Sequence, residues 1–180
     1  MQEGRIWRRW GAAGALLLSV AAALPALAAP PPPGSFASRA LDVHNQERAA
    51  VGVPLMEWDE TLAAHAAEWA GYLLAIGSLV HSPEDDQTGD PEGENLWAGT
   101  HGAYTPEEMI GLWTEEKLFF VPGRFPDNSR SGNVADVAHY TQVVWRSSTR
   151  VGCAIAEGEE DDFLVCRYKE AGNVIGERPF

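Results

Sequence analysis

The first helical pattern of the chain lies between Ser35 and Gly52. Ser35 or Ser38 can cap its start, and Gly52 is well placed to cap its end. One face carries an unusually polar stripe, formed by Leu41, His44, Asn45 and Arg48. If this face turns inward, its polar groups need buried hydrogen-bond partners. The pattern therefore predicts a helix that joins the core partly through paired polar side chains.

Two further helical patterns follow. After a short connector at residues 54–58, Asp59 caps a helix that ends at Gly77. The apolar stripe of this helix predicts a buried face made by Leu62, Ala66, Trp69, Ala70 and Leu73. The sequence Thr105-Pro106-Glu107-Glu108 starts a third helix, because it combines a cap, an early proline and acidic residues near the positive end of the helix dipole. This helix is expected to run towards Phe120.

The pattern changes in the last part of the chain. Residues 151–156 and 163–168 are β-rich runs separated by an acidic turn, which is typical of an antiparallel hairpin. Helices and a hairpin together predict an α+β fold. Residues 82–93 show no periodicity and predict a surface loop. Residues 122–136 also show none, and their length favours a functional or covering loop.

The N-terminus resembles a secretory signal. Residues 1–10 carry three arginines, and the apolar stretch 11–27 is shorter than the ~20 residues needed to span a bilayer. It contains Pro25 and ends in the small-residue pattern Ala26-Leu27-Ala28. We expect cleavage after Ala28; the alternative is an uncleaved anchor with the following prolines as a spacer. Because no later segment is apolar enough to span, no stable membrane insertion is expected after cleavage.

These observations divide the chain into a signal peptide at 1–28, a proline-rich linker at 29–34 and a single domain at 35–180. The whole chain has a formal net charge of −13, and removal of three arginines and one glutamate with the signal changes it to −15. A nucleic-acid partner is not expected, since phosphate binding needs a basic face. The remaining 152 of 180 residues suit one domain with a sizeable core.

The chain has two cysteines, Cys153 and Cys166, one on each strand of the expected hairpin. In an exported protein, two such cysteines predict a disulfide, and a bond across the strand pair is geometrically possible. Closing this loop stabilises the fold by roughly 3 kcal/mol in the chain-entropy account. No thiol is then left for chemistry.

Four separated motifs occur in one order along the chain. They are His44-Asn45-Gln46-Glu47-Arg48, Gly93-Glu94-Asn95-Leu96-Trp97, His139-Tyr140-Thr141-Gln142-Val143-Val144-Trp145, and Cys166-Arg167-Tyr168 with Gly172-Asn173. Together they resemble the signatures of the CAP superfamily, named for cysteine-rich secretory, antigen 5 and pathogenesis-related 1 proteins. The resemblance implies an α-β-α sandwich with a small antiparallel sheet between helical layers. Two cysteines, where many eukaryotic members have six, are more like the compact bacterial representatives, so we expect a bacterial source and export to the periplasm or medium.

The resemblance also implies a cavity lined by two histidines and two glutamates. The matching residues are His81, Glu94, Glu116 and His139. Glu115 competes with Glu116, and only the spacing Trp113-x-x-Glu favours the latter. Two imidazoles and two carboxylates suit a divalent cation such as zinc. Of the other signature residues, His44, Asn45 and Arg48 are expected to hold helix to helix, and the following are assigned to structure as well: Asn95, Tyr140, Gln142, Trp145 and Asn173.

Several other polar and aromatic residues favour structural roles. His65 lies between apolar residues of its helix and predicts a core histidine, and His101 predicts an exposed loop residue. Core packing is expected of Trp69, Trp97, Trp113 and Trp145. Solvated surface is expected of an acidic run that lacks the spacing of a calcium loop: Glu84, Asp85, Asp86, Asp90 and Glu92.

We favour a secreted binding protein with a metal in the His/Glu cavity and a nearby groove for an apolar or extended ligand, such as a lipid, sterol or peptide. One alternative is a metal-dependent, protease-like hydrolase, in which His81 and His139 hold a metal-bound water and Glu94 or Glu116 acts as base. A Ser82 nucleophile is weaker, because adjacent residues seldom direct their side chains at each other. A further alternative is an envelope or adhesion component without a small ligand.

Overall fold

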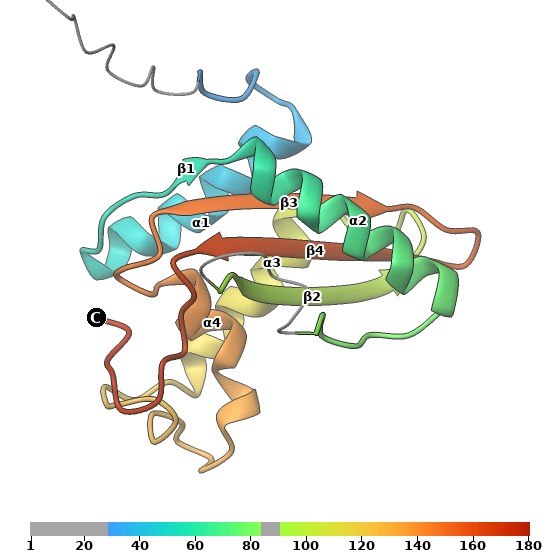
Figure 1. Cartoon of the computed structure of the whole chain (residues 1–180). Helices are drawn as coiled ribbons and strands as arrows, with labels where there is room; N and C mark the ends of the chain where they lie inside the picture. The colour runs from blue at the N-terminus through green and yellow to red at the C-terminus, as the bar shows by residue number, and fades with distance from the viewer. Residues whose placement is uncertain (1–28, 84–90) are drawn as a thin grey trace, which may run out of the picture.

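A computed structural model describes residues 29–83 and 91–180. The expected signal peptide and most of the acidic run lie outside these residues. The chain forms α1 (Phe36–Val51), β1 (Glu57–Trp58), α2 (Glu60–Ile76), β2 (Gly93–Thr100), α3 (Pro106–Glu115), α4 (Ala138–Val143), β3 (Arg150–Ala156) and β4 (Asp161–Lys169) (Figure 1). Single 3-10 turns occupy Glu116–Leu118 and Val134–Asp136.

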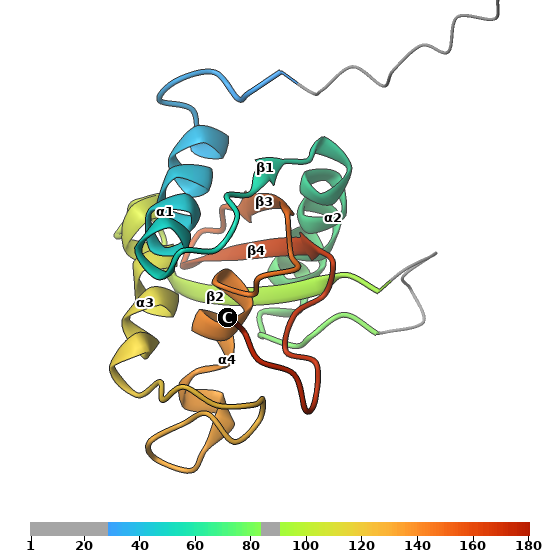
Figure 2. The same cartoon turned by 90° about the vertical axis from the view of Figure 1, so that its left-hand side faces the viewer.

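The four strands form one sheet in the order β1-β3-β4-β2. β4 pairs antiparallel with both β3 and β2, whereas the two-residue β1 pairs parallel with β3. α2 covers one face of the sheet, and α1, α3 and α4 lie on the other side (Figures 1 and 2). The expected α+β fold, an α-β-α sandwich, is confirmed.

Residues of β4 alternate between the two layers. Phe163 and Val165 pack with Ala66, Ala70 and Leu73 of α2. On the other face, the core joins β4 to α1 and α3 through a set that includes Ala40, Ile110, Trp113, Leu164, Cys166 and Tyr168. This alternation follows from the two-residue period of a strand. It also decides which layer each polar side chain of β4 enters.

The expected helix ends are confirmed where capping chemistry marks them. The Ser35 side chain accepts a hydrogen bond from the Ser38 backbone at the start of α1, and Gly52 ends it at φ 71°. Asp59 caps α2, and Gly77 ends it at φ 62°. Such left-handed backbone favours glycine because a side chain there is strained. α3 begins with a capping box between Thr105 and Glu108.

Several elements differ from the sequence expectation. α3 ends at Glu115, five residues before Phe120. Residues 93–100 form the edge strand β2, and Ala138–Val143 form the short helix α4; neither was predicted. Of the four tryptophans assigned to the core, Trp97, Trp113 and Trp145 are buried, whereas Trp69 is only partly buried and donates its indole N–H to the Val80 carbonyl at 3.0 Å. Across residues 29–83 and 91–180, no helix is long and apolar enough to cross a membrane.

Candidate functional site

His139 and Glu116 form the first pair of the predicted site. His139 lies in α4, and its Nδ1 is 2.6 Å from Oε1 of Glu116. The other carboxylate oxygen accepts the backbone N–H groups of His139 and Tyr140 at 2.9 and 3.0 Å. Trp113 stacks on the imidazole with ring centroids 5.9 Å apart. The early end of α3 thus presents Glu116, not Glu115, to His139.

His81 and Glu94 form the second pair. His81 follows α2, and its Nδ1 is 2.6 Å from Oε1 of Glu94, which also accepts the Ser82 backbone N–H at 3.1 Å. The second oxygen, Oε2, is 2.9 Å from Nη2 of Arg167 on β4. The Glu94 side chain is 6% exposed and the His81 side chain 69% exposed. The hydrogen bond that His81 donates to Glu94 raises the pKa of His81.

The two pairs share a design. In each, Nδ1–H donates to a carboxylate, and the opposite ring nitrogen, Nε2, has no hydrogen-bond partner among the described residues. Both pairs contact the first residues of β2: Glu94 lies on this strand, and the neighbouring Asn95 donates to the His139 carbonyl at 3.1 Å. Within residues 29–83 and 91–180, however, no three donor atoms of these four side chains lie within 4.8 Å of one another. The structure therefore shows two imidazole–carboxylate pairs, not a compact four-residue cluster.

The prediction for His65 was wrong. This residue lies on the exposed side of α2, and its Nδ1 is 2.8 Å from Oε1 of Glu92. Glu92 is correspondingly not solvated surface: its side chain is 11% exposed, and Oε2 is 3.7 Å from Nη1 of Arg167. A helix pattern could not reveal this, because the partner is 27 residues away in sequence.

Arg167 is the site residue that sequence reasoning missed. Its side chain is 6% exposed, and its guanidinium contacts the carboxylates of Glu92 and Glu94. In the sequence, Arg167 appeared only as the central residue of the Cys166-Arg167-Tyr168 motif. The signal that could have identified it is a buried-strand arginine in a chain with two glutamates spaced by two residues, because a buried charge needs partners.

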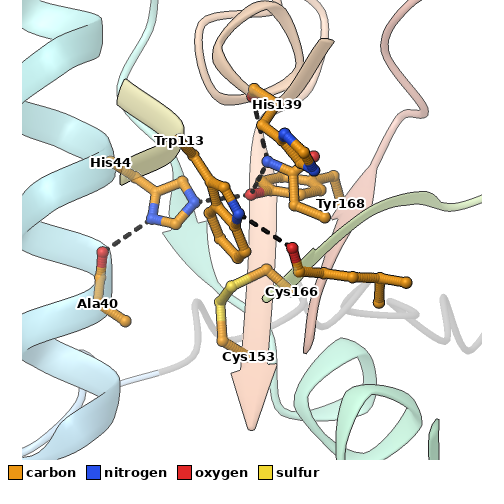
Figure 3. Close-up of a disulfide and its surroundings, with 9 residues drawn as sticks. Ala40, His44, Trp113, His139, Cys153, Cys166 and Tyr168 are labelled. Carbon is orange, nitrogen blue, oxygen red and sulfur yellow. Dashed lines mark hydrogen bonds between the residues drawn. A yellow bond between two sulfur atoms is a disulfide. The ribbon is translucent and has the colours of Figure 1, made fainter. Parts of the chain in front are cut away.

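A buried polar chain connects α1 to the His139 segment (Figure 3). His44 Nδ1–H donates to the Ala40 carbonyl at 2.8 Å, and Nε2 accepts from the Tyr168 hydroxyl at 2.9 Å. The same hydroxyl accepts from Asn95 at 3.2 Å. Burial lowers the pKa of His44 to about 4, so the imidazole is neutral, as this donor-and-acceptor pattern requires.

The disulfide between Cys153 and Cys166 is confirmed. The residues are directly opposed on β3 and β4, with Cα atoms 4.1 Å apart. His44 lies beside both sulfurs. Among the described residues, this is the only group of three or more His, Cys, Asp or Glu side chains whose potential ligand atoms all lie within 4.8 Å of one another. Since both sulfurs are bonded to each other, they offer no thiolate for a metal.

The expected polar stripe of α1 does face inward. Arg48 donates to the carbonyls of Pro54, Val143, Trp145 and Ser148 at 2.7–2.8 Å. Asn45 exchanges hydrogen bonds with the Met56 backbone at 2.7 and 3.0 Å. These bonds tie α1 to the connector before β1, to Val143 at the end of α4 and to the segment that follows α4.

The remaining signature residues also form structural contacts. Gln142 accepts the Gly172 N–H at 2.9 Å, and Asn173 donates to the Ala138 carbonyl at 2.9 Å. Trp145 is buried, and the Tyr140 side chain packs against Phe120. These contacts fasten the last segment of the chain to α4.

A separate hollow of about 400 Å³ lies on the outer side of α3. Its lining combines apolar and acidic groups: Tyr104, Glu107, Glu108, Gly111, Leu112 and Glu115. Arg39 forms an ion pair with Glu107, and Glu108 belongs to the helix cap. Glu115 thus contributes to this hollow and not to the His139 pair.

The motifs, the fold and the paired histidines define a CAP domain, and comparison with known proteins agrees. The cysteine-rich secretory protein family, CAP, matches residues 41–168, so the chain belongs to this family. It is similar to pathogenesis-related protein 1C of Nicotiana tabacum, with 38% identity over 141 residues that cover 78% of each chain. Pathogenesis-related protein 1 of Arabidopsis thaliana is also 38% identical, over 78% of this chain and 80% of that protein.

The fold likewise resembles solved structures. The crystal structure of NaASP2 with Zn²⁺ has a TM-score of 0.67 at 22% identity, covering 79% of this chain and 83% of that one. An outer surface protein from Borrelia burgdorferi has a TM-score of 0.51 at 15% identity, covering 77% of this chain and 89% of that one. At these identities, the likeness concerns the fold.

Proposed function

We propose that this CAP-domain protein is an exported binding protein that holds a divalent metal ion, preferentially zinc, through His81 and His139. The observation that carries the proposal is the shared design of the two pairs. A carboxylate on Nδ1 fixes the ring and its tautomer, which leaves Nε2 unprotonated and able to ligate. Such carboxylate–histidine units are the usual support of histidine-bound zinc.

The donor chemistry fits zinc. Imidazole nitrogen suits this borderline ion, and NaASP2, which has a similar fold, was crystallised with Zn²⁺. Glu94 and Glu116 would act on the metal indirectly, by orienting the histidines. When bound, the ion would supply positive charge and open coordination positions for a ligand donor atom.

For the second ligand, we propose an apolar or extended molecule such as a lipid, sterol or peptide. The hollow along α3 supports this choice, since Tyr104 and Leu112 are 43% and 45% exposed there. Its wall includes Glu115, adjacent in sequence to the Glu116 that holds His139. Apolar side chains with a few polar groups are the ordinary lining of a ligand site.

The hydrolase alternative has less support. Each glutamate proposed as its base is already engaged by an imidazole, and Glu94 also by Arg167. In the described part of the chain, the Ser82 hydroxyl has no hydrogen bond to a histidine; it is the Ser82 backbone N–H that bonds Glu94. The envelope or adhesion role gains no specific observation, and the bacterial source inferred from two cysteines stays a prediction.

Calorimetric titration with zinc tests the metal proposal. Wild type should bind one ion at pH 7.5, and the His81→Ala/His139→Ala double variant should lose it while remaining folded. His101→Ala is the matched control, because it removes an exposed imidazole held by a carboxylate in the same way but outside this site, and it should keep wild-type affinity. Binding should weaken at pH 5.5, since protons compete for imidazole nitrogen. Equal zinc affinity in wild type and the folded double variant would refute the proposal.

Export is tested separately by intact mass. The secreted protein should begin at Ala29. A product that retains Met1 and fractionates with membranes would contradict the proposed cleavage.

A further inference from the structure

The guanidinium of Arg167 joins the His81–Glu94 pair to a further imidazole–carboxylate pair, His65–Glu92. Along the α2 side of the sheet, the order of contacts is His65, Glu92, Arg167, Glu94, His81. Glu92 and Glu94 are two residues apart, so both side chains extend to the same side of the chain as the cross-strand partner Arg167. Arg167 thereby separates two carboxylates that would otherwise adjoin in a nearly water-free place.

Two neighbouring, poorly solvated carboxylates are ligands that a hard cation such as Ca²⁺ accepts. Here their oxygens have other partners. Oε1 of each glutamate binds an imidazole N–H, while Oε2 of each faces Arg167. For the buried Oε2 of Glu94, no hydrogen bond supplements the ion pair with Arg167 within the described structure. The guanidinium is therefore the cation that this carboxylate already has.

We propose that Arg167 is a specificity-determining residue: by occupying Glu92 and Glu94 it excludes hard, oxygen-seeking cations and leaves imidazole Nε2 as the ligand atom on this side of the site. The part of this inference that concerns zinc rests on the proposed metal-binding function. The exclusion of calcium follows from the ion pairs alone. The Arg167 guanidinium neutralises the charge of the two carboxylates, as a bound metal ion would. The site is left selective for ions that prefer nitrogen.

The test compares wild type, Arg167→Gln and Arg167→Lys, each with calcium and with zinc. Arg167→Gln removes the charge and should create a calcium site of millimolar affinity, detected as a rise in melting temperature of a few degrees in ~10 mM Ca²⁺. Zinc affinity should fall about tenfold or more, because Glu94 would no longer be fixed beneath His81. Wild type and Arg167→Lys, which retains the positive charge, should show no stabilisation by calcium.

Two further measurements separate the possible failures. Adding Glu94→Gln to Arg167→Gln should abolish the calcium response. If wild type itself is stabilised by calcium and Glu94→Gln is not, the proposal is overturned, whether or not Arg167→Gln folds. A folded Arg167→Gln with no calcium response also overturns it. By contrast, wild-type zinc binding that survives loss of His81 and His139 refutes the proposed function and leaves the calcium comparison decisive for Arg167.

Discussion

Nε2 of His44 accepts a hydrogen bond from the Tyr168 hydroxyl at 2.9 Å, in the fully buried space between α1 and β4. Since Nδ1–H is bonded to the Ala40 carbonyl, Nε2 is the only position for a second proton. Burial also raises the pKa of Tyr168 far above its usual range, so the hydroxyl keeps its proton. Protonation of His44 would therefore remove the acceptor of the Tyr168 hydroxyl and place a charge in the buried space between helix and strand.

This contact predicts an acid-sensitive fold. The pKa of His44 is about 4 when folded and 6.5 ordinarily, so only the unfolded chain takes up this proton between those pH values. His44 should therefore remove about 3 kcal/mol of stability as the pH falls from 6.5 to 4. Urea unfolding at pH 7 and pH 4.5 should show a smaller difference for His44→Gln than for wild type. An equal loss of stability between pH 7 and pH 4.5 in wild type and in His44→Gln would contradict the assignment.

Arg48 should matter for stability and little for metal binding. Arg48→Ala leaves four carbonyls without their donor, so the free energy of unfolding should fall by about 3 kcal/mol or more. Asn45→Ala loses only the two bonds to Met56 and should cost about 1–3 kcal/mol. Denaturant titration measures both. Zinc calorimetry on the protein that remains folded should give wild-type affinity, and near-normal melting temperatures would show that the stripe does not stabilise the fold as assigned.

A second histidine should give pH dependence of opposite sign. His101 Nδ1 is 2.7 Å from Oδ1 of Asp162, which also accepts the Gly158 N–H at 3.2 Å, while Oδ2 accepts Gly102 N–H at 2.9 Å. The hydrogen bond to Asp162 raises the pKa of His101. Burial acts to raise the pKa of Asp162, but these hydrogen bonds outweigh it and the pKa is lowered.

The His101 contribution is therefore complete below pH 6.5 and lost as pH rises through the folded pKa. Melting temperatures of wild type and His101→Gln should differ most near pH 6 and converge near pH 9. Asp162→Asn removes the negative charge next to His101. In that background, His101→Gln should no longer change the melting temperature. A difference in melting temperature that stays constant with pH would indicate that His101 stabilises the fold through packing and not through its charge.

Gly152 should resist even a single added methyl group. A Cβ here would lie 2.2 Å from the Ala63 nitrogen and 2.5 Å from the Asp59 carbonyl oxygen, both backbone atoms at the start of α2. Gly152→Ala should therefore lower stability by about 3 kcal/mol. Gly71, an exposed residue of α2 with open space around it, is the matched control. Gly71→Ala should leave stability equal or raise it by about 0.5–1 kcal/mol; similar unfolding midpoints for both variants would argue against close helix–sheet packing.

Local signals explain which elements were predictable. α1 and α2 were found because caps and glycine ends mark them, and the β3–β4 hairpin was found because its strands are contiguous and β-rich. β2 was missed because both of its faces are covered and it contains two glycines, which weakens the alternation. α4 has six residues, fewer than two helical turns, so it carries little periodicity.

The candidate site was likewise predictable only where the sequence carries a local signal. The resemblance identified the four residues of the two pairs, but their pairing depends on contacts 13 and 23 residues apart. His65 was misplaced because its stripe position suggested burial, while its charged partner lies across a loop. Arg167 needed the register of β4 against β2 before its two carboxylates could be recognised.

The central place of β4 in the sheet limits how this protein can evolve. An outer strand has a side on which substitutions accumulate without consequence, but β4 has neighbours at both edges and covered faces above and below. Inserting or deleting one residue would bring Arg167 into the layer that holds the cystine and send Tyr168 towards α2. Divergence among descendants of this sequence should therefore proceed by slow, compensated exchanges in this strand, and length changes should collect in the segments outside it.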